Sequence, residues 1–202
     1  MAIKALLNDP TNSYLICQIG NNREILIAAP HHAPLGVSQL PCETHPTSDE
    51  NTGWIAYHLS QNLDCGCLIA GNYFFDPNKH KTSDYFRRIE SIKPKFLIEI
   101  HGHGGVSANF DLEISSGSRD KSYLSERMAD YLQNSFAKID HLKNYTISGE
   151  FEKIHFKATK SLTINTNLWT AFHIELPQKV REDEGQYMDF CDIAKESILK
   201  FL

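Results

Sequence analysis

The segment Phe96–Gly105, with the sequence FLIEIHGHGG, brings together residue types that can do chemistry. Its first half is a short apolar run typical of a buried parallel strand. Its second half places His101 and His103 at the carboxyl end of that strand, where open α/β sheets bind their ligands. Because side chains alternate along a strand, Glu99 shares a face with His101. The segment therefore predicts a metal or catalytic site, against the simpler interpretation of two loop histidines after a core strand.

Ionisable side chains also stand at the ends of two other expected strands and at the start of an expected helix. They are His31 and His32 after strand 24–29, Glu175 in strand 171–176, and Asp49 and Glu50 at the helix start. Two imidazoles, one carboxylate and an open position for water make a catalytic zinc site, with metal–ligand bonds of about 2.0–2.2 Å. A separate carboxylate can take a proton from the water. Together these positions predict a hydrolytic zinc site.

Each of these groups also has a purely structural interpretation. Thr47 and Glu50 have the spacing of a capping box, in which Glu50 satisfies a helix N-terminus. Glu175 has Lys179 and Arg181 nearby in the sequence as partners for a surface ion pair. The two histidines in the proline-flanked segment can be solvated loop residues. The joint appearance of these groups at strand ends favours the functional interpretation.

Hydrophobic periodicity predicts alternating strands and helices. The expected strands are 24–29, 67–71, 96–100 and 171–176, with a further strand pair at 145–147 and 151–156, and segments 30–48 and 72–79 are expected to be loops. The expected helices are one that opens at 47–50 and carries Ile55, Leu59 and Leu63, then 83–92, about 120–136, and 184–201. This alternation predicts a single α/β domain over residues 1–202, a three-layer α/β/α sandwich with a mostly parallel mixed sheet.

Charge and composition narrow the classes of partner. The 202 residues include 20 Lys and Arg against 25 Asp and Glu, which gives a net charge of −5. No basic run stands out, so the sequence predicts neither nucleic acid nor membrane as a partner. The first twenty residues lack the pattern of a signal peptide or a membrane span, and a cytoplasmic location is expected. The oligomeric state is left open.

The five cysteines are an odd number and have no zinc or redox spacing. Cys65 and Cys67 are separated by one residue, whereas zinc knuckles and redox pairs use two. Free thiols in a reducing compartment are therefore expected. A cysteine hydrolase that uses Cys42 or Cys65 with a loop histidine is the alternative.

Five short segments carry a resemblance to a known family. In chain order they are APHH at 29–32, DENTG at 49–53, DPNK at 76–79, IEIH at 98–101 and FHIE at 172–175. Their order and spacing, from about Glu24 to the C-terminal helix, resemble the N-formylglutamate amidohydrolase-like family. This family lies within the clan of zinc carboxypeptidases and succinylglutamate desuccinylases, so the resemblance implies a zinc-carboxypeptidase-like fold.

The resemblance implies a zinc-dependent amidohydrolase acting on a small N-acyl amino acid, N-formylglutamate-like, or on a short peptide. The expected zinc ligands are His31 or His32, His101, and one acidic residue. The clan's compact His-x-x-Glu pair is absent, so the acidic ligand must come from Asp49 or Glu50, with Glu50 preferred. Glu175 is the expected general base, on the strand that resembles the one carrying the family's catalytic glutamate.

On the substrate side, the resemblance implies that Asn78 and Lys79 orient a carboxylate or another polar group. His103 is the expected donor to the negative charge that develops on the substrate. Lys79 stands where the clan has an arginine, and a lysine lacks the two-pronged guanidinium. The alternative function is a non-catalytic domain on the same fold that binds a metal or an acidic ligand.

Overall fold

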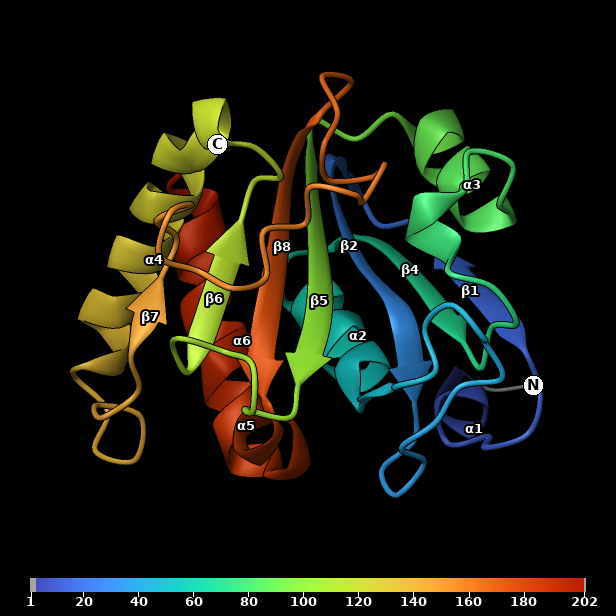
Figure 1. The fold of residues 1–202 in the computed structure, drawn as a ribbon, viewed down its shortest axis with the longest axis horizontal. Helices are drawn as coiled ribbons and strands as arrows, with labels where there is room; N and C mark the ends of the chain where they lie inside the picture. Colours follow the sequence, from blue (N-terminus) through green and yellow to red (C-terminus); the bar gives the residue numbers. More distant parts are fainter. Residues whose placement is uncertain (1–2, 202) are drawn as a thin grey trace.

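One eight-stranded sheet forms the centre of the molecule, described by a computed structural model over residues 3–201 (Figure 1). The strands are β1 (Tyr14–Gln18), β2 (Asn22–Ala33), β3 (Asp49–Glu50), β4 (Cys65–Gly71), β5 (Phe96–His103), β6 (Leu112–Ser115), β7 (Ile147–Ser148) and β8 (Thr170–Pro177). Their order is β1-β4-β2-β5-β8-β6-β7, and the short β3 pairs with the end of β2. The central strands β4, β2, β5 and β8 are parallel, whereas β1 and β6 are antiparallel to their inner neighbours. The predicted α/β class with a mostly parallel mixed sheet is confirmed.

The two faces of the sheet are covered differently. The helices are α1 (Ile3–Leu7), α2 (Thr52–Asn62), α3 (Asp84–Ile92), α4 (Ser122–Phe136), α5 (Gln178–Glu182) and α6 (Glu184–Leu199), with 3₁₀ turns η1 (Pro77–Lys79) and η2 (Arg119–Lys121). In Figure 1, α2 and α6 lie behind the sheet, and α3 lies in front of it. Side chains from α2, α4 and α6 form the larger core with one face, and α3 and segment 161–169 form a smaller core with the other.

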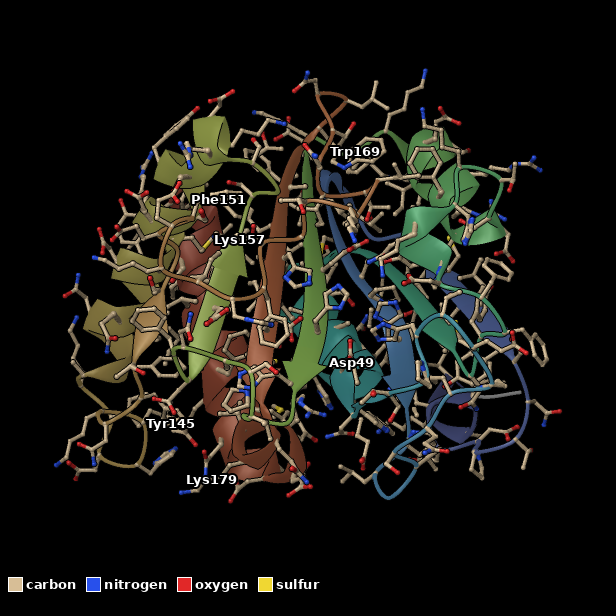
Figure 2. The ribbon with its side chains drawn as sticks, viewed as in Figure 1. Asp49, Tyr145, Phe151, Lys157, Trp169 and Lys179 are labelled. Atoms are coloured by element: carbon tan, nitrogen blue, oxygen red, sulfur yellow. The ribbon has the colours of Figure 1, made fainter. Side chains whose placement is uncertain are left out.

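The apolar stripes that predicted the helices are the surfaces that these helices bury. Ile55 and Leu59 of α2 and Phe190 of α6 are fully buried in the larger core. The smaller core covers only part of its face, with Trp169 at one end of the strands. Figure 2 shows that Asp49 lies near the opposite, carboxyl end of the central strands. That end of the front face is therefore left for polar side chains.

Two predicted local structures around the histidines and acidic residues are wrong. Strand β2 continues through the proline-flanked segment to Ala33 and does not end at Ala29. Asp49 and Glu50 do not cap a helix, because they form β3 beside β2, and α2 begins only at Thr52. Both errors arise because strand pairing with a distant segment overrides a local turn or cap signal.

The predicted strand pair at 145–147 and 151–156 is also wrong for the most part. Only Ile147–Ser148 forms a strand, and it pairs with β6. Segment 151–156 is irregular, and its backbone N–H groups at His155 and Phe156 donate to the buried carboxylate of Glu113 and not to a neighbouring strand. Within residues 3–201, no helix is both long enough and apolar enough to cross a lipid bilayer.

Candidate metal centre and active site

A β-bulge in β2 decides which of the adjacent histidines faces the front of the sheet. Between positions 29 and 32, β2 contains one residue more than β4 opposite it. Pro30 lies in this stretch and has no N–H to donate to the ladder. Because side chains alternate along a strand, the extra residue shifts the alternation by one position. His31 then lies on the front face, and His32 points into the larger core behind the sheet.

Both ring nitrogens of His32 already have partners. Nε2 donates to the carbonyl oxygen of Leu7 at 3.0 Å, and Nδ1 accepts from the backbone N–H of Gly53 at 3.1 Å. The ring lies so close to Gly53 that a Cβ at that position would be 2.5 Å from it. His32 is therefore a structural residue that joins α1 and α2 to the sheet, and the structure does not bring it to the candidate site.

Replacing His32 tests this division of roles. We expect His32→Ala to lower the free energy of unfolding by about 2–4 kcal/mol, because it leaves a cavity and two buried backbone groups without partners. Zinc content should stay as in the parent protein. Urea denaturation and elemental analysis of the folded variant measure the two quantities. Loss of zinc from a folded His32→Ala protein would contradict the structural role.

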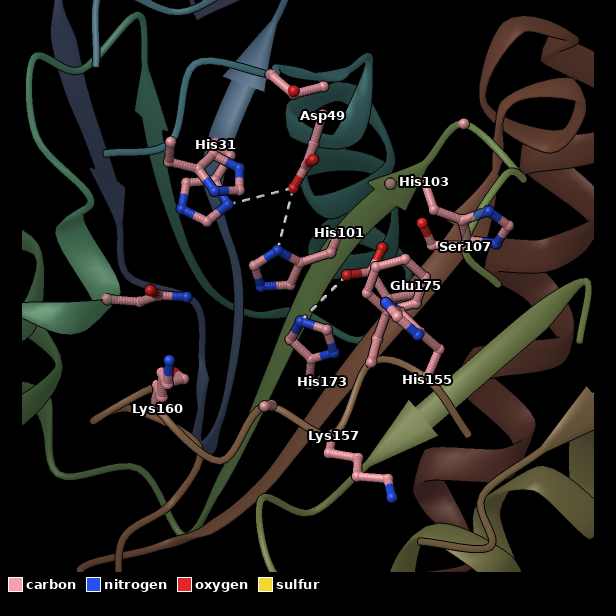
Figure 3. A pocket seen from close by; sticks show the side chains of 18 of the residues that line it. His31, Asp49, His101, His103, Ser107, His155, Lys157, Lys160, His173 and Glu175 are labelled. Atoms are coloured by element: carbon pink, nitrogen blue, oxygen red, sulfur yellow. Dashed lines mark hydrogen bonds and ion pairs between the residues drawn. The ribbon is translucent and has the colours of Figure 1, made fainter. Parts of the chain in front are cut away.

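Three buried side chains meet at the carboxyl ends of β2, β3 and β5 (Figure 3). Oδ2 of Asp49 lies 3.0 Å from Nδ1 of His101 and 3.3 Å from Nδ1 of His31. His31 Nδ1 is buried and forms no hydrogen bond of good geometry with any described residue. Ligand atoms of a tetrahedral zinc are about 3.3–3.5 Å apart, as follows from bonds of about 2.0–2.2 Å. The residues present therefore fit a zinc ion held by two imidazoles and one carboxylate.

Glu50, the preferred acidic ligand from the sequence, is not part of this cluster. Its Oε2 accepts the backbone N–H of Gly36 at 2.6 Å. Asp49 and Glu50 are consecutive residues of a strand, so their side chains point to opposite sides. The pairing of β3 with β2 turns Asp49 toward the two histidines, and Asp49, the alternative from the sequence, replaces Glu50 in the candidate metal centre.

Each histidine of the cluster has a second carboxylate close to its other ring nitrogen, Nε2. Nε2 of His31 donates to Oδ1 of Asp76 at 3.0 Å, and Nε2 of His101 lies 3.4 Å from Oε2 of Glu99. Histidines that bind metal ions usually donate their other N–H to a carboxylate or carbonyl, which fixes the ring and makes it a better ligand. The cluster therefore has the outer contacts of a metal site as well as the ligand atoms.

Removing one outer carboxylate should weaken metal binding without abolishing it. We expect Asp76→Asn to weaken zinc affinity by about 10–100-fold, because the neutral amide no longer orients and polarises His31. Competition with a fluorescent zinc chelator measures the affinity, with Asp120→Asn as an exposed control. Unchanged affinity in Asp76→Asn would show that Asp76 does not support the metal centre.

The electrostatics of the cluster favour charged, paired groups when no metal is bound. Burial by itself lowers the pKa of His101, but hydrogen bonds to Asp49 and Glu99 outweigh it and raise the pKa to about 10. Burial raises the pKa of Asp49, but His101 and His31 hold it well below its usual range. Asp49 is thus ionised at neutral pH, as a metal ligand must be, and metal binding must displace the proton of His101.

Glu175 and His173 continue the polar surface on β8. Register pairs Glu175 with His101 and His173 with Glu99, so all four face the front of the sheet. Oε1 of Glu175 lies 3.3 Å from Nε2 of His173, and its buried Oε2 has no hydrogen-bond partner among the described residues. Burial raises the pKa of Glu175 to about 8. A carboxyl group with a raised pKa and a free oxygen beside a metal centre is suited to proton transfer.

The alternative interpretation of Glu175 as half of a surface ion pair is wrong. Glu175 is buried, and the nearby Arg181 instead donates to backbone carbonyl oxygens. The three carbonyl oxygens that accept from Arg181 belong to Glu50, His103 and Leu176. Arg181 therefore ties β3, β5 and β8 together close to the cluster.

Most of the polar atoms of the residues expected to contact a substrate already have partners within the protein. Lys79 Nζ lies 2.5 Å from Oδ2 of Asp76, so it supports the metal centre from behind. Asn78 Nδ2 donates to Oε2 of Glu99 at 3.4 Å, while the buried Oδ1 has no hydrogen-bond partner among the described residues. His103 uses both ring nitrogens, accepting from Gly105 N–H at 3.0 Å and donating to the Asp111 carbonyl at 2.9 Å. Of the three, Asn78 alone presents an unused buried polar atom.

Sequence reasoning missed His45 and gave no role to His173 or Asp76 in the cluster, and it placed Glu99 on the face of His101 only as a reserve candidate for the general base. His45 stacks on His31, with ring centroids 3.8 Å apart. No local pattern marks it, because only the fold of segment 34–48 brings it to the sheet. His173 had a signal, since it is two residues from Glu175 on a strand and must share its face.

A cavity of about 530 Å³ opens over these side chains. Its walls come from segments 104–107 and 155–161, and its floor includes the candidate metal centre and Glu175 (Figure 3). All five cysteines are free, and none lines this cavity in the described part of the chain. Burial also raises the pKa of Cys65 to about 12, which opposes formation of a nucleophilic thiolate. The cysteine hydrolase alternative therefore does not fit the structure.

Comparison with known proteins places the fold. No protein-family model matches the sequence, and no curated protein matches it significantly. A bacteriophage poly-γ-glutamate hydrolase matches with a TM-score of 0.59 and 11% identity, over 99% of this chain and 94% of that chain. The gene product Atu2144 from Agrobacterium tumefaciens matches with a TM-score of 0.57 and 11% identity, over the full length of both chains.

An N-acetylmuramoyl-L-alanine amidase is also similar. The catalytic domain of CwlV from Bacillus (Paenibacillus) polymyxa var. colistinus matches with a TM-score of 0.54 and 14% identity, over 88% of this chain and 97% of that chain. At these identities the likeness shows a common fold, and two of the three similar proteins are named as hydrolases of amide bonds. Membership of the N-formylglutamate amidohydrolase-like family stays a prediction.

Proposed function

We propose that this protein is a zinc-dependent amidohydrolase that cleaves an amide bond of a small N-acyl amino acid or short peptide. The observation that carries the proposal is one arrangement on the floor of the cavity. Donor atoms of His31, Asp49 and His101 converge there, and a buried carboxylate of Glu175 with one unused oxygen faces the same space. The fold shared with named amidases supports the same reaction class.

The proposal assigns metal binding and proton transfer to different residues of the chain. His31, Asp49 and His101 would hold zinc, which when bound supplies a Lewis acid at the scissile carbonyl and makes water more acidic. Glu175 takes a proton from the attacking water and returns it to the leaving amine. Its position on β8 directly beside His101 keeps the carboxylate next to the metal centre. Glu175 stands outside the His31–Asp49–His101 set and forms a second group of possible ligand atoms with His101 and His173.

Asn78 contributes to the choice of substrate in this proposal. Its Nδ2 faces Glu99, a carboxylate that can only accept when ionised, so its Oδ1 is the atom left for a ligand. An oxygen acceptor fits an N–H donor of a substrate and does not fit a carboxylate. Lys160, an exposed residue on the cavity wall, offers a positive charge for a carboxylate there.

Metal analysis and a substrate panel test the proposed function. Protein purified without chelator should contain one zinc per chain and hydrolyse at least one of N-formyl-L-glutamate, a short γ-linked glutamate peptide and N-acetylmuramoyl-L-alanine. Removal of zinc with 1,10-phenanthroline should abolish hydrolysis, and added zinc should restore it. A zinc-loaded protein that hydrolyses none of the three would favour the non-catalytic binding domain, and a protein without zinc affinity would overturn the metal centre.

A further inference from the structure

Glu113 on β6 is a fully buried carboxylate. Its partners are backbone N–H groups from two segments that are far apart from each other in the sequence. Oε1 accepts from the N–H of Asn109 at 2.7 Å and of Phe110 at 3.2 Å. Oε2 accepts from the N–H of His155 at 2.7 Å and of Phe156 at 2.8 Å. A single side chain therefore fixes residues 109–110 and residues 155–156 relative to each other.

These two segments lead directly into the walls of the cavity. Segment 104–107 precedes Asn109, and segment 155–161 contains the other pair of donors. Two further contacts join the segments: Asn109 Nδ2 donates to the Lys153 carbonyl at 2.8 Å, and the rings of His103 and Phe156 stack with centroids 5.6 Å apart. The two segments thus form one wall, which we call the Glu113 wall (residues 103–111 and 151–161).

The Glu113 wall lies next to the proposed catalytic carboxylate. Glu113 pairs with Glu175 across the antiparallel β6–β8 ladder. A buried carboxylate is costly unless it is fully hydrogen-bonded, and bonds to an ionised acceptor are roughly twice as strong as neutral ones. Replacing this carboxylate by an amide therefore removes the acceptor for one of the two segments and unlinks it from the other.

We propose that Glu113 is a positioning residue that holds the Glu113 wall at the distance from the metal centre that the substrate requires. This inference rests on the proposed function only for its effect on substrate binding. The hydrogen-bond partners of the Glu113 carboxylate are backbone N–H groups and include neither a candidate metal ligand nor Glu175, so Glu113 acts through the loop backbones. Disturbing it should loosen substrate binding and spare metal binding and proton transfer.

Glu113→Gln is the principal test, with the exposed Glu90→Gln as a matched control. Glutamine keeps the size of the side chain, but its NH2 group replaces one carboxylate oxygen. That NH2 group then faces backbone N–H groups, which are also donors, so no hydrogen bond can form there. In the zinc-loaded variant we expect hydrogen exchange to accelerate by at least about tenfold at two of the four bonded amides, the pair that faces the new NH2 group, because the other pair keeps an amide oxygen as acceptor. Amides of the central strands should stay protected. For any panel substrate that the parent cleaves, KM should rise by about tenfold with kcat within about threefold and zinc unchanged.

Asn109→Ala provides a second variant in case Glu113→Gln does not fold. It removes only the side-chain bond to the Lys153 carbonyl and should raise KM and amide exchange in the same direction by a smaller factor. Unchanged exchange at the four amides in Glu113→Gln, or a fall in kcat with KM unchanged, would overturn the proposal. If the parent cleaves no panel substrate, the proposed function fails, and the exchange measurement still decides whether Glu113 holds the wall.

Discussion

Glu175→Gln should reduce the turnover of any substrate that the parent protein cleaves by about 10²–10⁴-fold. Glutamine has the size and shape of glutamate but cannot accept the proton of the attacking water. Because Glu175 is not one of the three proposed ligands His31, Asp49 and His101, we expect zinc content and thermal stability to stay close to those of the parent. Steady-state kinetics and elemental analysis of the same preparation measure both quantities.

The pH dependence gives a second way to observe Glu175. Burial raises its pKa to about 8 in the metal-free protein, so its carboxylate form is lost as the pH falls through that value. A cation in the neighbouring site favours the ionised form, so zinc should shift the low-pH limb of the activity profile, where Glu175 becomes protonated, toward lower pH.

Glu182→Gln on the exposed side of α5 is the control for Glu175→Gln, and it should leave the rate unchanged. Two outcomes would contradict the role of Glu175. A Glu175→Gln protein that hydrolyses substrate at the parent rate would end the general-base assignment. Loss of zinc from that variant would make Glu175 a ligand, and Glu99 would not be free to replace it as base, because Tyr85, Asn78 and His101 already surround its oxygens.

Asp49→Asn should abolish stoichiometric zinc binding, whereas Glu50→Gln should retain it. The two residues are neighbours in the sequence, and each substitution removes one charge without a change in size, so each controls for the other. Asp49 contributes the carboxylate between the two histidines, and its loss should weaken zinc affinity by more than about 100-fold, beyond the effect of an outer residue.

Elemental analysis and chelator competition compare the pair, with His101→Ala as the reference for a protein that has lost a ligand. Zinc retained in Asp49→Asn and lost in Glu50→Gln would reverse the assignment. It would imply that, when metal is bound, Glu50 faces the two histidines and Asp49 points away from them. Equal zinc in His101→Ala and the parent would place the metal elsewhere.

The sequence by itself determined the elements that are marked by local periodicity. The apolar runs at 96–100 and 171–176 are strands, and the four-residue spacing of Met128, Leu132 and Phe136 is the buried stripe of α4. Parallel strands bring their carboxyl ends to one edge of a sheet, so His101 and Glu175 could be placed side by side before the structure was known. The single domain and the cytoplasmic location stay predictions.

Only the tertiary structure decided which member of each adjacent pair faces the site. His31 and His32 are equivalent in a sequence pattern, and the bulge beside Pro30, set by pairing with β4, separates them. Asp49 and Glu50 read as a helix cap, and pairing of β3 with β2 separates them as well. A shift of one residue reverses every side chain of a strand, and register depends on hydrogen bonds to segments far away in the chain. Local patterns therefore identify the residues that can do chemistry, but non-local pairing selects those that meet.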